Sequence, residues 1–393
     1  MDIKFKEDKN GKIADKDKFF DKLDEMLDKE DYSAAAEAIL SIPREKWSLK
    51  LRFRLINAYS NLRDFAKAEK ELDEAAELCE KPNDVARVHY SRGYLCYMDD
   101  KDIMAREHYI RAAKTDPKYA KQIGLDEDIN ECGKMISEDL ASYHALCETI
   151  SAQIKARCNE NSKKKNISDE GFQMRLGFFP AIRKLPGFER PMGFEDYFAE
   201  YKGEDRKNCL RWFENFYGVT DEDSFFRHIH NDTGCNIARM VFDVAAYLAG
   251  EPNFDIKQLN EGGRFSFETT AMFVTTFLEY LPKAGVLAWD ISEKIGFARH
   301  AHRCGIISNS EYAKGMLALS DNAKSNFSGW EEYMRSLIFG AGLFMFGTDE
   351  WSIQGAAKFM SNMTPLLVQS DLADVIWYGG EKPYDRENYK HRS

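Results

Sequence analysis

The sequence predicts an all-α protein, with an N-terminal superhelix of helical hairpins followed by a mainly helical C-terminal domain. Three observations predict it. One pattern of paired amphipathic helices recurs between Asp31 and Pro117. Beyond residue 170, helix-start signals are frequent and sustained period-2 alternation is scarce. Between the two parts, residues 159–166 contain no apolar side chain, as is typical of a linker. We therefore predict a helical repeat domain at 1–158, a linker at 159–169 and a mainly α-helical domain at 170–393.

Charge and composition exclude several classes of function. The net charge of −11 argues against general nucleic-acid binding, which needs a basic surface. The first residues, Met1–Lys6, contain no apolar signal core. The longest apolar stretch, Leu337–Gly347, is far shorter than the roughly 20 residues that span a bilayer, and we interpret it as a buried core helix. We expect a cytoplasmic protein with no membrane or nucleic-acid partner and no cofactor.

The repeat is clearest in its central hairpin. An apolar stripe at three- and four-residue spacing predicts the first helix, Arg63-Asp64 form the turn, and the second helix follows. The second helix begins with Ala68, which recurs as Ala105, 37 residues later, and as Ala35, 33 residues earlier. The positions that carry the central pattern are Leu51, Leu55, Ala58, Tyr59, Leu62, Ala68, Leu72 and Ala75.

Residues 16–119 resemble the tetratricopeptide repeat (TPR), and the last unit resembles it most closely. That unit carries Gly93 on its first helix and Pro117 at its end. Between them, its second helix has the family pattern Ala105, Tyr109 and Ala112. The resemblance implies about three hairpins, with the first unit as a degenerate cap. Residues 126–158 then predict one or two further helices that cap the stack.

Membership of the TPR family would imply a groove that holds another protein or a peptide. The family's carboxylate clamp is not expected here, because Phe53 and Ser91 stand where the clamp has lysine and asparagine, although Asn57 matches. The alternative is an aromatic groove, for which the partner-binding candidates are Phe53, Asn57, Tyr90 and Tyr94. An equally simple interpretation is that these aromatic residues are partly packed helix faces.

The C-terminal half carries three Ser/Asp-x-x-Glu helix-start signals, beginning at Asp290, Ser308 and Ser328. The helix that Asp290 starts is expected to end at Gly305. Residues 285–347 are similar to a bacterial family of domains of unknown function (DUF1266). The similarity rests on Ala288-Trp289-Asp290, Phe297-Ala298-Arg299, Gly305-Ile306-Ile307-Ser308 and Gly329-Trp330-Glu331-Glu332-Tyr333. Because this family has no established activity, the resemblance implies a fold and no mechanism.

Two groups of residues are candidates for chemistry in this half. The string His228, His230 and Asp232 could hold a metal ion if alternate side chains shared a face, but the helical flanks favour a polar helix end, so no metal is predicted. Asp290, Arg299 and Trp330 form the other candidate site, in which Arg299 would bind a carboxylate or phosphate. The competing interpretation is structural, with Asp290 as a helix cap, Trp330 in the core and Arg299 paired with an internal carboxylate.

The function that the sequence favours is protein–protein interaction or scaffolding through the TPR-like groove. The alternative is an enzyme in the C-terminal domain, such as a metal-dependent hydrolase that uses the region around His228. The sequence identifies no catalytic residue, and it leaves the partner and the oligomeric state open.

Overall fold

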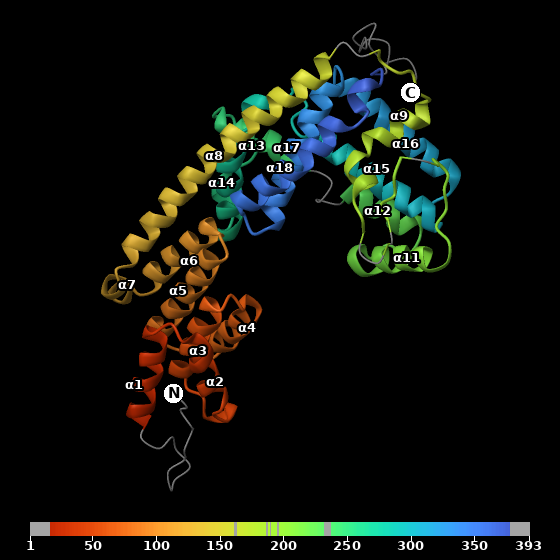
Figure 1. The fold of residues 1–393 in the computed structure, drawn as a ribbon. Helices are drawn as coiled ribbons and strands as arrows, with labels where there is room; N and C mark the ends of the chain where they lie inside the picture. Colours follow the sequence, from red (N-terminus) through yellow and green to blue (C-terminus); the bar gives the residue numbers. More distant parts are fainter. Residues whose placement is uncertain are drawn as a thin grey trace. The chain divides into compact units, whose positions relative to one another are not determined.

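The computed structural model describes residues 16–160, 163–185, 188, 190–194, 196–231 and 237–377. Within these residues the protein has eighteen α-helices, four short 3-10 helices and one isolated β-bridge, which confirms the all-α fold (Figure 1). The chain divides into two compact units. Unit 1 contains residues 1–139 and 350–354, and unit 2 contains residues 140–349 and 355–393.

Unit 1 is built from three antiparallel helical hairpins that follow one another along the chain. A short helix and the first part of the long helix α8 come after them. The hairpins are α1 (Lys16–Asp28) with α2 (Tyr32–Leu40), α3 (Leu49–Asn61) with α4 (Phe65–Ala76), and α5 (Pro82–Met98) with α6 (Asp102–Thr115). They are followed by α7 (Pro117–Ile123) and α8 (Leu125–Asn159), and η1 (Arg44–Lys46) lies between the first two hairpins.

The turns of the three hairpins repeat the same backbone geometry. A non-glycine residue has positive φ in each: Glu30 at 60°, Arg63 at 57° and Asp100 at 57°. The residue after it donates its N–H to a carbonyl five positions back in all three turns, at 2.9 Å. These closures are Asp31 to Met26, Asp64 to Tyr59 and Lys101 to Cys96. The periodicity of the sequence therefore corresponds to a repeated structural unit.

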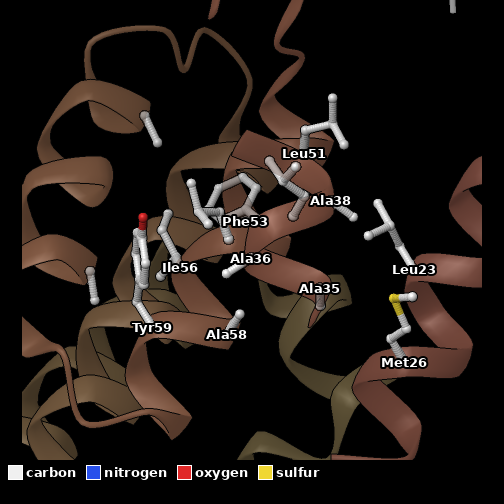
Figure 2. Close-up of a cluster of buried hydrophobic side chains, with 14 of the residues drawn as sticks. Leu23, Met26, Ala35, Ala36, Ala38, Leu51, Phe53, Ile56, Ala58 and Tyr59 are labelled. Carbon is white, nitrogen blue, oxygen red and sulfur yellow. The ribbon is translucent and has the colours of Figure 1, made fainter. Parts of the chain in front are cut away.

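The core of unit 1 depends on small residues where the helices approach closely. Ala35, Ala68 and Ala105, which occupy the same repeat position, have no exposed surface. Figure 2 shows the cluster around α1, α2 and α3, in which Phe53 lies among buried aliphatic side chains. In the third hairpin, a Cβ at Gly93 would lie 2.5 Å from the Tyr109 ring, so only glycine permits this contact between α5 and α6.

Unit 2 surrounds the central helix α15 (Leu287–Cys304), most of whose side chains are buried. Helices α9, α10, α11, α13, α16 and α17 all pack against it, and a helix buried on every side is typical of the middle of a large core. The other α-helices of this unit are α9 (Asp169–Leu176), α10 (Phe178–Ile182), α11 (Gly203–Tyr217), α12 (Glu222–Asn231), α13 (Ile237–Leu248), α14 (Glu261–Thr275), α16 (Asn309–Asn326), α17 (Trp330–Thr348) and α18 (Ile353–Gln369), whose first two residues belong to unit 1. The 3-10 helices are η2 (Ile256–Gln258), η3 (Leu278–Tyr280) and η4 (Leu372–Asp374).

Two of the expected helix starts in this unit differ in detail from the structure. Helix α15 begins at Leu287, so Asp290 lies inside the first turn and does not cap its own helix. The end of α15 at Gly305, with φ 81°, is as expected. Ser308 caps α16 as predicted, accepting from the Glu311 N–H at 3.2 Å. Before α17, it is Glu332 that accepts from the Ser328 N–H, one position later than the motif suggested.

The apolar stretch beginning at Leu337 forms the C-terminal half of α17 and is mostly buried, as the sequence predicted. No helix in the described ranges is long and apolar enough to cross a membrane.

The part of the predicted linker that the structure describes belongs to unit 2. There, Lys165 forms a single β-bridge with Val375. The Ile376 N–H donates to the Lys165 carbonyl at 3.0 Å. The first and longer segment of unit 1 ends at Asp139, inside α8. The domain limits 1–158, 159–169 and 170–393 stay a prediction.

Candidate functional site

A pocket of about 110 Å³ lies in unit 1, where α5, α6 and the start of α8 meet. Four tyrosines, two carboxylates and one thiol line it, and no lysine or arginine is among these residues. They are Tyr90, Tyr94, Tyr97, Tyr109, Asp128, Glu131 and Cys132. The pocket combines aromatic side chains with converging polar groups, and its volume suits a small chemical group but not a whole cofactor.

Helical periodicity places these side chains together. Tyr90, Tyr94 and Tyr97 occupy positions i, i+4 and i+7 of α5 and therefore share one face of that helix. Helix α6 contributes Tyr109, whose ring lies 5.6 Å from the Tyr90 ring. Helix α8 contributes Asp128, Glu131 and Cys132 at positions i, i+3 and i+4. The pocket thus depends on both the third hairpin and the helix that follows it.

Among the described residues, the tyrosine hydroxyls and carboxylates that line the pocket form few short hydrogen bonds. The Tyr94 hydroxyl donates to Asn61 Oδ1 at 3.0 Å. The Tyr97 hydroxyl lies 3.5 Å from Glu131 Oε1, which is at the limit of a hydrogen bond. Glu131 is exposed at the rim and Asp128 is half-buried. These carboxylates therefore remain available to a ligand.

The electrostatic field in this region is negative. The pKa of Cys132 is raised to about 12, mainly by burial, with contributions from the carboxylates of Asp102, Asp128 and Glu131 and an opposing one from Arg106. Burial also raises the pKa of Tyr90 to about 12, with a contribution from Asp128. Burial, with Glu131 and other acids nearby, raises the pKa of Asp128 itself. A positive charge entering the pocket would relieve this repulsion between like charges.

A buried carboxylate that does not line the pocket acts on Cys132 and Tyr97 and adds to this field. Asp102 is only 5% exposed, and neither of its oxygens has a hydrogen-bond partner among the described residues. Burial, with repulsion from Asp139 as the next cause, raises the pKa of Asp102 to about 6. At neutral pH it is therefore largely ionised, and it lies in the first turn of α6, where the helix dipole favours a negative charge.

The structure places the four predicted partner-binding residues in different environments. Tyr90 and Tyr94 line the pocket. Phe53 is packed in the core with the Arg87 guanidinium 4.4 Å from its ring centre, and Asn57 is exposed outside the pocket. Sequence reasoning missed Tyr97, although its spacing from Tyr90 and Tyr94 was a usable signal. It also missed Asp128 and Glu131, because they lie beyond the repeat.

In unit 2, Asp290 holds the start of a neighbouring helix. Its two carboxylate oxygens accept from the backbone N–H groups of Ile237 and Ala238, both at 3.0 Å, at the beginning of α13. Burial raises the pKa of Asp290 to about 6, although these two hydrogen bonds act in the opposite direction. The carboxylate therefore serves as a helix cap, but for α13 instead of its own helix.

Arg299 and Trp330 contact different residues from each other and from Asp290. The Arg299 side chain is 1% exposed and donates from Nη2 to the Gly193 carbonyl at 2.9 Å. Burial lowers the pKa of Arg299 to about 10, and no carboxylate pairs with it within the described part of the chain. The Trp330 ring packs against the rings of Phe172 and Trp377. The structure therefore does not bring Asp290, Arg299 and Trp330 together, and their joint role as a site stays a prediction.

The candidate metal ligands fall partly outside the described residues. His228 is on α12, with its ring 5.0 Å from those of both Tyr217 and Phe297. The side chain of His230 and the whole of Asp232 are outside the described residues. No group of three or more metal-binding side chains occurs in the ranges that the structure does describe.

His300 gives a pH-dependent prediction. It is buried, and one ring nitrogen lies 2.9 Å from the Tyr201 hydroxyl. Burial, with repulsion from Arg299 next, lowers its pKa from 6.5 to about 3. As the pH falls below 6.5 the unfolded chain binds a proton first, so the stability that depends on neutral His300 is present above pH 6.5 and is lost between there and pH 3. Between pH 7 and pH 5 the unfolding free energy of His300→Phe should fall by about 1–2 kcal/mol less than that of the wild type. Urea titrations at each pH would measure it.

The control for His300→Phe is His144→Phe, because the His144 side chain is 45% exposed in the same unit. Its Nε2 lies 2.9 Å from Glu279 Oε1, so this variant measures the effect of losing an exposed histidine, and the effect of His300→Phe should exceed it. Asp290 titrates in the opposite direction, but it is present in every variant and cancels in the comparison. Equal pH dependence in wild type and His300→Phe would contradict the prediction.

Comparison with known families agrees with the C-terminal resemblance. A family model described as "Protein of unknown function (DUF1266)" matches residues 213–373, which is less than half of the chain. This range contains Trp289, Arg299 and Trp330, and thus the motifs on which the resemblance rests. No curated protein and no solved structure matches the chain.

Proposed function

We propose that this chain is a protein-interaction protein, and that unit 1 is a TPR-like module that holds a segment of another protein. The tyrosine-lined pocket carries the proposal, because it is a preformed site on a stack of helical hairpins. Stacked hairpins of this kind present extended surfaces to partner proteins. Aromatic residues, and tyrosine in particular, are enriched where such partners anchor. In this proposal, unit 2 is the part of the protein whose activity or further contacts the partner directs.

The test compares partner capture by the full chain with capture by a variant that has lost part of the pocket. Tyr94→Ala combined with Tyr97→Ala removes two pocket walls from α5. Glu138→Ala is the control, because Glu138 is exposed on α8 and outside the pocket. Circular dichroism would first establish that all three proteins have the same helix content.

We expect at least one protein to be captured by the wild type and the control but not by the double variant. That protein, once purified, should bind the double variant at least about tenfold more weakly, because interface tyrosines are frequent hot spots. A purified partner that binds the double variant and the wild type equally would overturn the assignment of the pocket to partner binding.

A further inference from the structure

We propose that the pocket of unit 1 binds the guanidinium group of an arginine side chain. This inference rests on the proposed function in one respect, that the arginine belongs to a partner protein. The binding chemistry itself depends only on the pocket. The observation that carries it is the combination of four tyrosines with two carboxylates and no basic residue in the lining of a cavity of about 110 Å³.

The aromatic walls favour a cation with a weak hydration shell. The face of a tyrosine ring attracts a positive charge, and the attraction grows when the charge is desolvated. The Tyr109 ring is buried and packs against the Tyr90 ring at 5.6 Å, so the aromatic surface that a ligand can reach comes from the half-buried Tyr90, Tyr94 and Tyr97. A guanidinium is planar and weakly hydrated, so it stacks on such rings more readily than an ammonium.

The carboxylates supply the hydrogen-bond acceptors that a guanidinium needs. Asp128 and Glu131 lie three positions apart on α8, on the same side of that helix. Arginine has five N–H donors in a fixed plane, whereas a quaternary ammonium has none. Asp128 is half-buried, which strengthens its interaction with a charged donor compared with a carboxylate in water. The pocket therefore matches a donor-rich cation better than a fully alkylated one.

One basic side chain lies close to the pocket: Arg106 of α6 is exposed, and its Nε is 3.6 Å from a Cβ built at Gly133, the residue after Cys132. Of the basic residues of the third hairpin, Arg92 pairs with Asp73, and Lys101 pairs with Asp99 and Glu350. Arg111 pairs with Glu107. These three cations already have carboxylate partners, whereas the oxygens of buried Asp102 have no hydrogen-bond partner among the described residues. An arginine from outside would therefore meet two lining carboxylates, Asp128 and Glu131, that form no ion pair within the described part of the chain.

The test uses two blocked amino acids that differ mainly in charge. N-acetyl-arginine-methylamide and its citrulline counterpart have nearly the same shape, but only the first is a cation. The probe is the full chain labelled with 3-fluorotyrosine, whose fluorine resonances report on its 18 tyrosines. Tyr94→Phe and Tyr97→Phe assign two of the pocket resonances. A third compound, blocked lysine, tests whether the pocket prefers a guanidinium to a simple ammonium.

We expect the arginine compound to shift the pocket resonances and to bind at least about tenfold more tightly than the citrulline compound. Asp128→Asn should weaken arginine binding by about tenfold, because a charge-assisted hydrogen bond becomes a neutral one. Glu138→Gln, on the same helix but outside the pocket, should leave it unchanged. Equal binding of arginine and citrulline, or of wild type and Asp128→Asn, would overturn the proposal. Lysine binding as tight as arginine binding would overturn the choice of guanidinium.

This inference and the proposed function can fail separately. If blocked arginine binds but no protein depends on the pocket for capture, the partner role fails and the cation site stands. If a captured partner binds equally well after its arginines are replaced by glutamine, the partner role stands and the arginine assignment fails.

Discussion

Gly340→Ala is expected to destabilise unit 2 by about 3 kcal/mol, near the upper end of the usual effect of overpacking a core. A Cβ at residue 340 would lie 2.4 Å from Cβ and 3.1 Å from Cγ of Trp289, and 3.2 Å from Cβ of Val286. The closest of these atoms is directly attached to the backbone of α15, so a side-chain rotation cannot move it away. The two central helices of the unit would have to separate, and Trp289, which is 2% exposed, would lose its close packing.

The matched control is Gly347→Ala on the same helix, where no atom lies within 4 Å of the added Cβ. It should be neutral or stabilise the protein by up to about 1 kcal/mol, because alanine is the better helix former. Native-state hydrogen exchange of the peptides from α15 and α17 would measure both effects within unit 2. Similar exchange rates in the two variants would show that the close contact at Gly340 is not required.

The helices of this protein could be predicted from the sequence because the signals for them are local. The apolar stripe around Leu55 and the small residues Ala68 and Ala105 identify hairpins without knowledge of their neighbours. The turn at Arg63 could also be placed. The positive φ of Arg63 could not be predicted, because arginine rarely adopts such a conformation.

The roles of individual polar residues in unit 2 could not be predicted in the same way. Asp290 was interpreted as a cap for the helix that it begins in the sequence. Its actual partners, Ile237 and Ala238, lie more than 50 positions earlier in the chain. Arg299 likewise donates to the Gly193 carbonyl, 106 positions away. Contacts over such separations are set by how the helices pack, and a single sequence does not encode that packing in a local pattern.

The pocket of unit 1 is an intermediate case. Tyr90 and Tyr94 could be identified because they lie on the helix face that the TPR resemblance assigns to binding. The sequence argued against the family's basic clamp but did not predict the opposite charge, which the carboxylates of Asp128 and Glu131 give to this pocket. They come from α8, outside the repeat, so the charge of the pocket could be seen only in the structure. We therefore base the choice of ligand on the structure and not on the family.

Arg52→Met is expected to destabilise unit 1 by about 3 kcal/mol, because it leaves a buried carboxylate without its best partner. Arg52 and Glu71 are 8% and 6% exposed, and Arg52 Nη1 lies 2.7 Å from Glu71 Oε2 between α3 and α4. Arg44 also contacts Glu71, at 2.9 Å, but its side chain is half-exposed and water screens its charge. Native-state hydrogen exchange of the α3 and α4 peptides would measure this loss of stability.

The second replacement, Glu71→Met, distinguishes the cost of an isolated charge from the value of the pair. In the double variant Arg52→Met with Glu71→Met, neither charge is buried and two apolar side chains fill the space. We expect it to recover most of the lost stability, because a buried ion pair and a well-packed apolar pair are often nearly equal in free energy. Arg92→Met is the control, since its partner Asp73 is 66% exposed, and it should cost less than about 1 kcal/mol. If the double variant were as unstable as Arg52→Met alone, the ion pair itself would be what holds the second hairpin together.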